Sequence, residues 1–477
     1  MVETTALLWL RHDLRLADNP ALTAASRHRH LLAVHLRERP PATATDWWRA
    51  RQLETLAADM ATRGGRLVLL DGDPETVVPR LCAEHGIDAV YWNRRYTPDG
   101  IARDSRLKSR LNNAGHHCQT FNAALLREPW TLRNRQGTPY RVFTPFWRAL
   151  SGELTPPEPR PAPERIPPPP EAATEGALAP PDHLPVHPWW RKLDACWQPG
   201  ETAAGERLHA FVGEAVEHYP EQRDFPAIAG TSRLSADLHH GALSPRRVLA
   251  ALYAVFPEPL ATPGPATFLA ELGWREFAHA ILYHFPETIS APLDPKFADL
   301  PWEIGDTPAF TAWRRGETGI PLVDAGMREL WATGWMHNRV RMVVASWLTK
   351  NLGHHWRDGA DWFMETLVDA DVASNTLGWQ WVAGCGADAA PYFRIFNPVR
   401  QAERFDPDGT YIARWVPELS PLPPRWRREP WKVPVREQSR TGFTPGRDYP
   451  LPQVDPAESR RAALARFQGL QTRASAG

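Results

Sequence analysis

The first third of the chain alternates short apolar runs with longer mixed segments, and this alternation limits the possible folds more than any other feature. The apolar runs have the length of buried strands and occupy residues 7–9, 31–36, 67–70, 89–92 and, more weakly, 119–121. The segments between them, such as residues 47–62 and 75–84, have the mixed pattern of helices. Strands that alternate with helices form a parallel sheet with helices on both faces. The sequence therefore predicts an α/β domain over residues 1–135, with a doubly wound, five-stranded parallel sheet.

The pattern changes after this predicted domain. Residues 155–188 are rich in proline, with a block of four at 167–170, which indicates an extended linker between domains. After residue 189 apolar residues recur at steps of three and four, the spacing of helices, over segments that include one long helix expected at 322–350, and no strand pattern is evident. We therefore predict a linker over 136–190, an all-helical domain over 191–445 and a tail over 446–477.

Charge and cysteine usage exclude several classes of protein. The chain has 55 basic and 55 acidic residues, so any DNA-binding role must rest on a local basic face. Its four cysteines stand far apart and form no CxxC motif, which suggests neither a zinc ribbon nor a disulfide framework and fits a reducing cytoplasm. Adjacent histidine pairs point to different faces of a helix, so no metal site is predicted. No apolar stretch is long enough to cross a membrane, and no signal peptide is evident.

Two helical segments carry polar and aromatic side chains on one face. In residues 268–279, Glu271, Trp274 and Arg275 share a face at steps of three and four. They could form a surface ion pair beside a core tryptophan, or the wall of a pocket that stacks a flat ligand. In residues 334–348, Asn338 is predicted to face the core, where an amide is costly unless it is paired. The adjacent His337 has the pattern of an ordinary, satisfied helical histidine.

A third segment, residues 369–398, is unusually rich in polar and aromatic residues. Asp371, Asn375 and Trp379 are spaced by four and form one column on a helix. A buried carboxylate needs a partner, and Arg341 is a candidate for Asp369. Farther upstream, the clustered hydroxyls of residues 231–235 could cap a helix or cradle a pyrophosphate at a helix N-terminus.

These segments together resemble the DNA photolyase/cryptochrome family over nearly the whole chain. The resemblance is carried by residues 9–22, 222–235, 271–277, 319–342 and 369–398, which follow one another in the family's order. It implies an N-terminal α/β domain, a long linker and a helical domain that binds FAD. Among the branches of the family, the chain is most similar to bacterial cyclobutane pyrimidine dimer photolyases of the class III type.

The resemblance also implies an FAD site in the helical domain. Residues that would hold the phosphates are Tyr219, Thr231, Ser232, Arg233, Leu234 and Ser235. Residues that would line the rest of the site are Phe268, Arg275, Arg341, Asp369, Ala370, Asp371 and Asn375. Asn375 would face the flavin N5, where a neutral amide can either donate or accept a hydrogen bond.

Two further sets of residues follow from the resemblance. Trp379, Trp356 and Trp302 match the three tryptophans that carry an electron from the surface to the photoexcited flavin. The set that would receive a flipped pyrimidine dimer is Glu271, Trp274, Asn338, Met342 and Trp381, with further lesion or DNA contacts at Arg394 and Gln401. Candidate phosphate contacts are Arg223, Arg275, Arg339 and Arg394.

The function implied is light-driven repair of cyclobutane dimers in UV-damaged DNA by reduced FADH⁻. A (6-4) photolyase is an alternative, but that branch has a histidine where Asn338 stands. A signalling cryptochrome is the main rival; such proteins often lose cavity residues that this chain keeps. The implied antenna is 5,10-methenyltetrahydrofolate, although Asp99 and Gly100 differ from the folate-binding pattern. We expect a bacterial, cytoplasmic monomer with no membrane association.

Overall fold

The computed structural model describes residues 2–171 and 179–476, which divide into two compact units. One unit comprises Met1–Glu217 with Ser232–Pro286, and the other comprises His218–Thr231 with Glu287–Gly477. The domain boundaries predicted from the sequence stay predictions. None of the described helices is long and apolar enough to cross a membrane.

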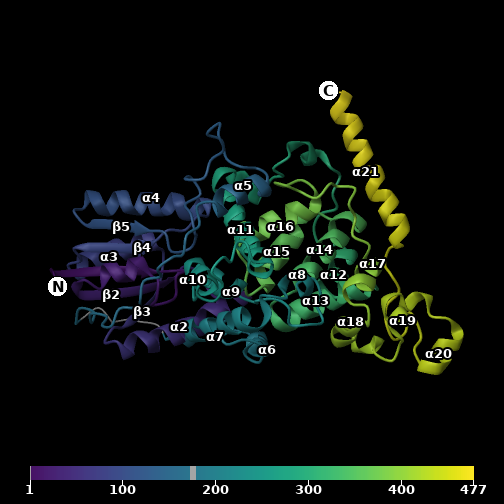
Figure 1. Ribbon diagram of the computed structural model, residues 1–477, viewed down its shortest axis with the longest axis horizontal. Helices are drawn as coiled ribbons and strands as arrows, with labels where there is room; N and C mark the ends of the chain where they lie inside the picture. Colours follow the sequence, from purple (N-terminus) through teal and green to yellow (C-terminus); the bar gives the residue numbers. More distant parts are fainter. Residues whose placement is uncertain (1, 172–178, 477) are drawn as a thin grey trace. The chain divides into compact units, whose positions relative to one another are not determined.

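The first unit contains a five-stranded parallel sheet, as the apolar runs predicted. Its strands are β1 (Val2–Leu10), β2 (His28–Arg37), β3 (Leu67–Asp71), β4 (Ala89–Asn93) and β5 (His117–Phe121). They are ordered β3-β2-β1-β4-β5, and every pair is parallel (Figure 1). The central strand β1 pairs with β2 on one side and with β4 on the other, so Leu8 lies between Ala33 and Tyr91.

Each face of this sheet is covered by helices, which makes the domain doubly wound. The helices are α1 (Pro20–Ala25), α2 (Ala44–Thr62), α3 (Pro74–Glu84) and α4 (Pro98–Asn113). Successive residues of β1 point to opposite faces. Leu8 packs in one core with Leu53 of α2, and Leu7 packs in the other with Val78 of α3 and Leu111 of α4.

The proline-rich linker is partly built into this unit. The amide of Ile166 donates to the carbonyl oxygen of Arg63 at 2.9 Å, and Leu31 on β2 donates to Pro168 at 3.0 Å. The Ile166 side chain is fully buried in the core that contains Leu53 and Met60 of α2. An extended linker thus supplies one core side chain to the α/β domain.

Further helices complete the first unit, one before the proline-rich stretch and the others after it. They are α5 (Phe143–Ser151), α6 (Arg191–Asp194), α7 (Glu201–Ala210), α9 (Ser235–His240), α10 (Pro245–Val255) and α11 (Pro263–His284). Helix α7 continues into a π-helical turn over Phe211–Ala215. The longest helix, α11, packs against α5.

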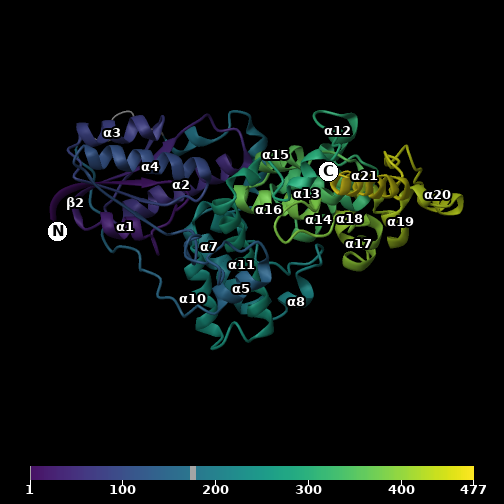
Figure 2. The ribbon, with the colours of Figure 1, turned by 90° about the horizontal axis from the view of Figure 1, so that it is seen from above.

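The second unit is helical. Its helices are α8 (Tyr219–Gln222), α12 (Pro308–Arg315), α13 (Pro321–Thr333), α14 (Asn338–Ser346), α15 (Trp356–Thr366), α16 (Val372–Ala383), α17 (Pro398–Phe405), α18 (Thr410–Trp415), α19 (Pro424–Arg428), α20 (Val435–Thr441) and α21 (Pro456–Ala476). Many begin with proline at the first helical position, where its missing N–H costs nothing. Figure 2 shows α19 beside α17 and α18, and α19 contacts both of these helices.

The stretch 322–350, expected to be continuously helical, is broken in the middle. Helix α13 ends at Gly334, which has a φ of +67° and is therefore in the left-handed region that favours glycine. Helix α14 begins only at Asn338, and a π-helical turn over Trp347–Asn351 follows it. The break sets the start of the helix that carries Asn338 and Arg341.

A buried ion pair fixes α4 against the sheet. Arg11, at the end of β1, donates to both carboxylate oxygens of Asp104 on α4, at 2.8 and 2.9 Å. The indole N–H of Trp92 on β4 donates to the same carboxylate at 3.1 Å. The Arg11 side chain is only 5% exposed, so a lost partner would leave its charge desolvated and unpaired.

We predict that Asp104→Ala lowers the free energy of unfolding by about 3–5 kcal/mol, because it strands the buried Arg11 guanidinium. Urea unfolding followed by circular dichroism measures the change. Glu75→Ala is the matched control, since Glu75 pairs with the exposed Arg106 and should change the unfolding midpoint little. Equal losses in the two variants would contradict the importance of the buried pair.

Candidate functional site

Helix α11 presents the predicted stripe of Glu271, Trp274 and Arg275. Its opposite side is buried through Leu269, Leu272 and other apolar residues. The three side chains of the stripe are half-buried, as expected for a wall that is neither core nor open surface. The spacing of three and four therefore places an acid, an indole and a guanidinium on one face of a single rigid helix.

Trp274 is held by a stacked aromatic partner that sequence reasoning missed. Its ring lies 3.8 Å from that of Phe143, the first residue of α5, with an interplanar angle of 9°. Phe277 meets Trp274 edge-on at 5.8 Å. One face of the indole is thus covered by Phe143, which fixes the plane of the ring.

Arg275 is used inside the unit. Its guanidinium donates to the carbonyl oxygen of Ala124 at 2.7 Å and lies 3.5 Å from the Glu276 carboxylate. Its side chain is only 15% exposed. Glu276 also accepts from the amides of Leu126 and Arg127, and burial raises its pKa to about 7. Because its guanidinium is already bonded and mostly buried, Arg275 is poorly placed to contact a DNA phosphate.

The hydroxyl-rich segment 231–235 does not cap a helix. The N-cap of α9 is Leu234, and no side chain of the described residues caps this helix. Ser232 accepts a hydrogen bond from the amide of Leu234 at 3.4 Å, and Arg233 has a φ of +53°. Thr231 belongs to the second unit and Ser232–Ser235 to the first, so the segment passes from one unit to the other.

Two aromatic residues of the predicted FAD site are buried. Phe268, on α11, lies 4.6 Å from Phe211 between ring centroids. Tyr219 opens α8 in the second unit, and the Arg223 guanidinium lies 5.1 Å from its ring. Both are core side chains that expose little surface.

In the second unit, Arg341 and Asp369 form the ion pair predicted from the sequence. The Arg341 guanidinium donates to both carboxylate oxygens of Asp369, at 2.9 and 3.1 Å, and its Nε donates to the carbonyl oxygen of Met336. The Asp369 side chain is 3% exposed, whereas that of Arg341 is 25% exposed. The pair ties the start of α14 to the segment that leads into α16.

Asp371, Asn375 and Trp379 lie in one column along α16. Asp371 is the N-cap, and its carboxylate accepts from the amide of Ser374 at 2.8 Å. The side-chain amide of Asn375 donates to the carbonyl oxygen of Ala360 on α15 at 2.9 Å. This bond fixes the rotamer of the amide, so its oxygen points away from α15.

Trp379 is enclosed by aromatic rings. It meets Phe363 edge-on at 5.0 Å and Trp313 at 6.1 Å. A Cβ added at Gly359 would lie 2.1 Å from the Trp379 ring, so only glycine leaves room for the indole. Its Nε1 is buried and has no hydrogen-bond partner among the residues that the structure describes.

A histidine joins the other two tryptophans of the predicted electron path. The His355 ring lies 5.5 Å from Trp302 and 5.5 Å from Trp356. Its Nδ1 accepts from the amide of Arg357 at 3.1 Å, as the N-cap of α15, and burial lowers its pKa. A neutral imidazole therefore separates Trp302, which is half-buried, from Trp356, which is 1% exposed.

Asn338 does not face the core, contrary to the prediction. It is the first residue of α14 and is exposed, because the helix begins there instead of passing through it. His337, expected to be an ordinary helical histidine, is the N-cap and is buried, which lowers its pKa to about 4. Met342 and Trp381 are half-buried and pack against the core of the second unit.

The candidate DNA contacts differ in exposure. Arg394 is exposed, with its guanidinium 5.7 Å from the Phe396 ring. Arg339 is paired with Asp224 at 2.7 Å and is 19% exposed. Gln401, on α17, has a buried side-chain oxygen without a described partner. Arg394 is therefore the member of this set best placed to meet a phosphate.

The residues of the second unit fit a flavin. The Arg341 side chain is partly exposed and its charge is balanced, while the Asn375 amide is oriented by one bond and keeps its oxygen available. A buried, unpartnered indole N–H lies on the same helix as Asn375. Such a set of charged, amide and aromatic groups suits a heterocycle with several hydrogen-bonding edges.

No metal site accompanies these groups. Within residues 2–171 and 179–476, no three or more histidine, cysteine, aspartate or glutamate side chains are arranged to hold a metal ion.

The predicted lesion-binding residues divide between the two units. Glu271 and Trp274 belong to the first, and Asn338, Met342 and Trp381 belong to the second. Each half is defined within its own unit, and their convergence stays a prediction.

Comparisons with known proteins identify the class. A family model for DNA photolyase matches residues 6–165, and a model for the FAD binding domain of DNA photolyase matches residues 268–469. The chain is 44% identical to the deoxyribodipyrimidine photo-lyase of Agrobacterium fabrum, over 98% of both chains. The protein therefore belongs to the DNA photolyase/cryptochrome family and has its FAD-binding domain.

Solved structures narrow the resemblance. A bacterial class III photolyase from Agrobacterium tumefaciens has a TM-score of 0.94 and 42% sequence identity, and the match covers 99% of this chain and 98% of that one. A cryptochrome from Synechocystis has a TM-score of 0.88 and 31% identity, with 98% and 99% covered. The expected fold, an α/β domain and a helical FAD-binding domain, is confirmed.

We predict that Asp369→Asn lowers both flavin content and stability, because the partly exposed Arg341 guanidinium loses its buried counter-charge. Breaking such a pair costs about 3–5 kcal/mol. The FAD-to-protein ratio of the purified protein and its melting temperature measure the two effects. The control is Asp361→Asn on α15, an exposed residue. Wild-type flavin content in Asp369→Asn would argue against a flavin-supporting role for the pair.

Proposed function

We propose that this protein is a deoxyribodipyrimidine photolyase, which uses blue light to split cyclobutane pyrimidine dimers in DNA. The observation that carries the proposal is the 44% identity to the Agrobacterium fabrum photo-lyase over 98% of both chains. The half-buried stripe of Glu271 and Trp274, and the polar set around Arg341, support it.

The FAD would be held by the residues that the family resemblance names. Tyr219 and residues 231–235 would bind its phosphates, and Phe268 and Arg275 would add contacts from α11. The flavin ring would meet Arg341, Asp369, Ala370, Asp371 and Asn375. When bound in its reduced form and excited by light, FAD supplies the electron that opens the dimer and takes it back afterwards.

The lesion would be recognised by shape and by one carboxyl group. Enzymes that act on a base inside a duplex first extrude it from the stack. Trp274, with one face covered by Phe143, would stack on the extruded dimer, and Trp381 would contribute a second indole. Glu271 would hydrogen-bond the pyrimidines, while Asn338 and Met342 would complete the cavity.

Trp379, Trp356 and Trp302 would serve as the electron path for reduction of the resting enzyme. Indole rings are readily oxidised, and these three lie at the core, at a helix start and near the surface. The neutral His355 between Trp302 and Trp356 keeps that gap free of charge.

Undamaged DNA would be held through its phosphates. Arg394 is an exposed cation on the segment that follows α16. Because phosphate contacts release counterions, affinity should fall with salt.

The proposed antenna is a reduced folate, 5,10-methenyltetrahydrofolate. Arg95 follows β4 at the carboxyl ends of the parallel strands, the edge at which such sheets bind ligands. Burial, together with Arg11, Arg103 and Arg49, lowers the pKa of Arg95 to about 10, and Asp99 opposes this shift. A cationic group of this kind suits a chromophore that carries carboxylates.

Mass analysis of the pigment released on denaturation identifies it, and a deazaflavin would contradict the assignment. Monomeric state and bacterial cytoplasmic location stay predictions.

A photoreceptor without repair activity is the second candidate, because the Synechocystis cryptochrome matches almost the full chain. A (6-4) photolyase is less favoured, since position 338 is asparagine and the neighbouring His337 is buried in the N-cap. Incubation of reduced protein with oligonucleotides that contain either lesion, in light and in darkness, separates the three. Light-dependent loss of the cyclobutane dimer supports the proposal, and its absence with FAD bound supports the photoreceptor.

We predict that Glu271→Gln slows dimer repair by about tenfold or more, because an ionisable hydrogen-bonding group is lost from the lesion. Flavin content should stay at the wild-type level. Single-turnover repair after a light flash measures the rate, with Glu258→Gln, an exposed site before α11, as the control. An unchanged rate would remove Glu271 from the active site.

We predict a different result for Trp379→Phe. Photoreduction of oxidised FAD should be lost, because phenylalanine is much harder to oxidise than tryptophan. Repair by chemically pre-reduced enzyme should persist. Absorption spectra during illumination follow the first process, and the dimer assay follows the second. Normal photoreduction in this variant would mean that electrons enter by another route.

A further inference from the structure

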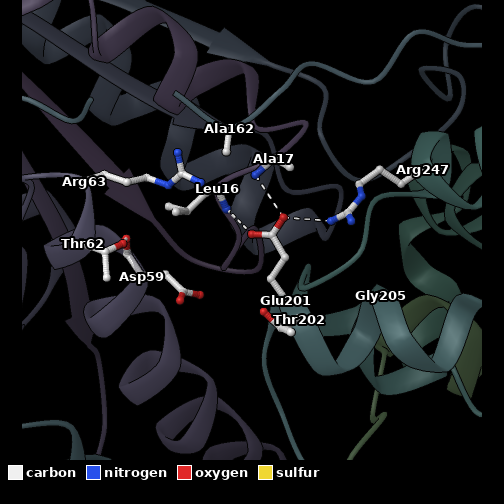
Figure 3. A pocket seen from close by; sticks show the side chains of 10 residues that line it. All are labelled: Leu16, Ala17, Asp59, Thr62, Arg63, Ala162, Glu201, Thr202, Gly205 and Arg247. Atoms are coloured by element: carbon white, nitrogen blue, oxygen red, sulfur yellow. Dashed lines mark hydrogen bonds and ion pairs between the residues drawn. The ribbon is translucent and has the colours of Figure 1, made fainter. Parts of the chain in front are cut away.

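The first unit contains a polar pocket that the proposed function does not use. Its volume is about 350 Å³, at the small end of the range for ligand sites. The charged and hydroxyl side chains that line it are Asp59, Thr62, Arg63, Glu201, Thr202 and Arg247. Figure 3 shows Asp59 and Thr62 on α2 facing Glu201 and Thr202 on α7.

Glu201 forms the fixed centre of this pocket. Its carboxylate accepts from the amides of Leu16 at 2.6 Å and Ala17 at 3.1 Å, and from the Arg247 guanidinium at 2.8 Å. These three bonds use most of its capacity. Glu201 therefore serves to hold the loop after β1 and to orient Arg247.

The two arginines keep donors for a ligand. Arg63 uses one N–H on the carbonyl oxygen of Pro163 at 2.8 Å, and Arg247 uses one on Glu201. A guanidinium has five N–H donors, so each retains several. Figure 3 shows the two groups on opposite sides of the Glu201 carboxylate.

Asp59 supplies the opposite charge. It lies one turn before Arg63 on α2, at half-buried exposure, and no described side chain bonds its carboxylate. Burial raises the pKa of the Asp59 carboxyl, and the positive charge of Arg63 offsets only part of this rise. A desolvated carboxylate without a direct partner gains most from a cationic hydrogen-bond donor.

The charges define the class of ligand. Two guanidinium groups and two carboxylates sum to zero, so an ion of either sign would leave the pocket with a net charge. A molecule with separated charges and no net charge matches this arrangement. No aromatic ring lines the pocket, so a nucleobase or a flat chromophore would lack a stacking surface. The threonine hydroxyls suit a polar remainder.

We propose that this pocket binds a small zwitterion, an α-amino acid with an uncharged polar side chain. The ligand's carboxylate would lie on Arg63, and its ammonium group on Asp59. Such a ligand would connect α2, the linker and α7, so it should also stabilise the first unit. The inference does not depend on the repair function.

Titration calorimetry of the full-length protein with L-glutamine tests the proposal. We expect binding of one equivalent. Two analogues, one without the α-ammonium group and one without the α-carboxylate, should each bind about tenfold more weakly or worse, since each loses a charged hydrogen-bonding group. Equal binding of either analogue, or no binding of L-glutamine at millimolar concentration, would overturn the assignment.

A variant pair locates the site. Asp59→Asn should weaken L-glutamine about tenfold and abolish its effect on the melting temperature, while light-dependent dimer repair stays unchanged. Glu214→Gln, an exposed change in the same unit, should leave binding as it is. If both variants bind L-glutamine like the wild type, the ligand is not in this pocket and the proposal fails.

Discussion

The first unit depends on one fully buried guanidinium. Arg15, in the loop after β1, donates to the carbonyl oxygens of Asp18, Ala123 and Gly241, at distances of 2.8, 2.8 and 3.0 Å. It thereby joins its own loop, the loop after β5 and the turn before α10. Burial lowers the pKa of Arg15, so these bonds offset a real desolvation cost. Gly241 admits the approach because a Cβ there would lie 2.2 Å from the His12 carbonyl oxygen.

Much of this fold follows from local sequence, and the exceptions have identifiable causes. The apolar runs predicted the five strands correctly because both faces of a parallel sheet are buried, so the inner strands are mostly apolar, whereas the edge strand β5 has the weaker signal. The long helix expected over 322–350 is interrupted at Gly334. Glycine is a known stop signal for helices, but the prediction considered only the apolar periodicity and ignored it. The sequence could not predict that His218–Thr231 belongs to the second unit, because this depends on pairs of residues far apart in the sequence, such as Arg339 with Asp224.

The candidate site divides in the same way. Arg341 could be matched to Asp369 because a buried carboxylate demands a cation. The prediction that Asn338 faces the core was wrong for a local reason. The helix begins at this residue instead of passing through it, so its side chain is exposed. Phe143 could not be found by spacing, because it is far from Trp274 in sequence and meets it only through the packing of α5 on α11. Periodicity finds residues that share an element, whereas stacking between elements needs coordinates.

The chain has no net charge, and the way its arginines are paired bears on how it can meet a polyanion. Several of its arginines form ion pairs with buried carboxylates inside the protein. Arg11 is paired with Asp104, Arg207 with Asp237 and Arg341 with Asp369, and each carboxylate is largely withdrawn from solvent. Such pairs add nothing to the field outside the protein, because each cation is neutralised where it lies. Attraction to DNA must therefore come from exposed cations without an acidic partner, and a count of arginines overestimates it.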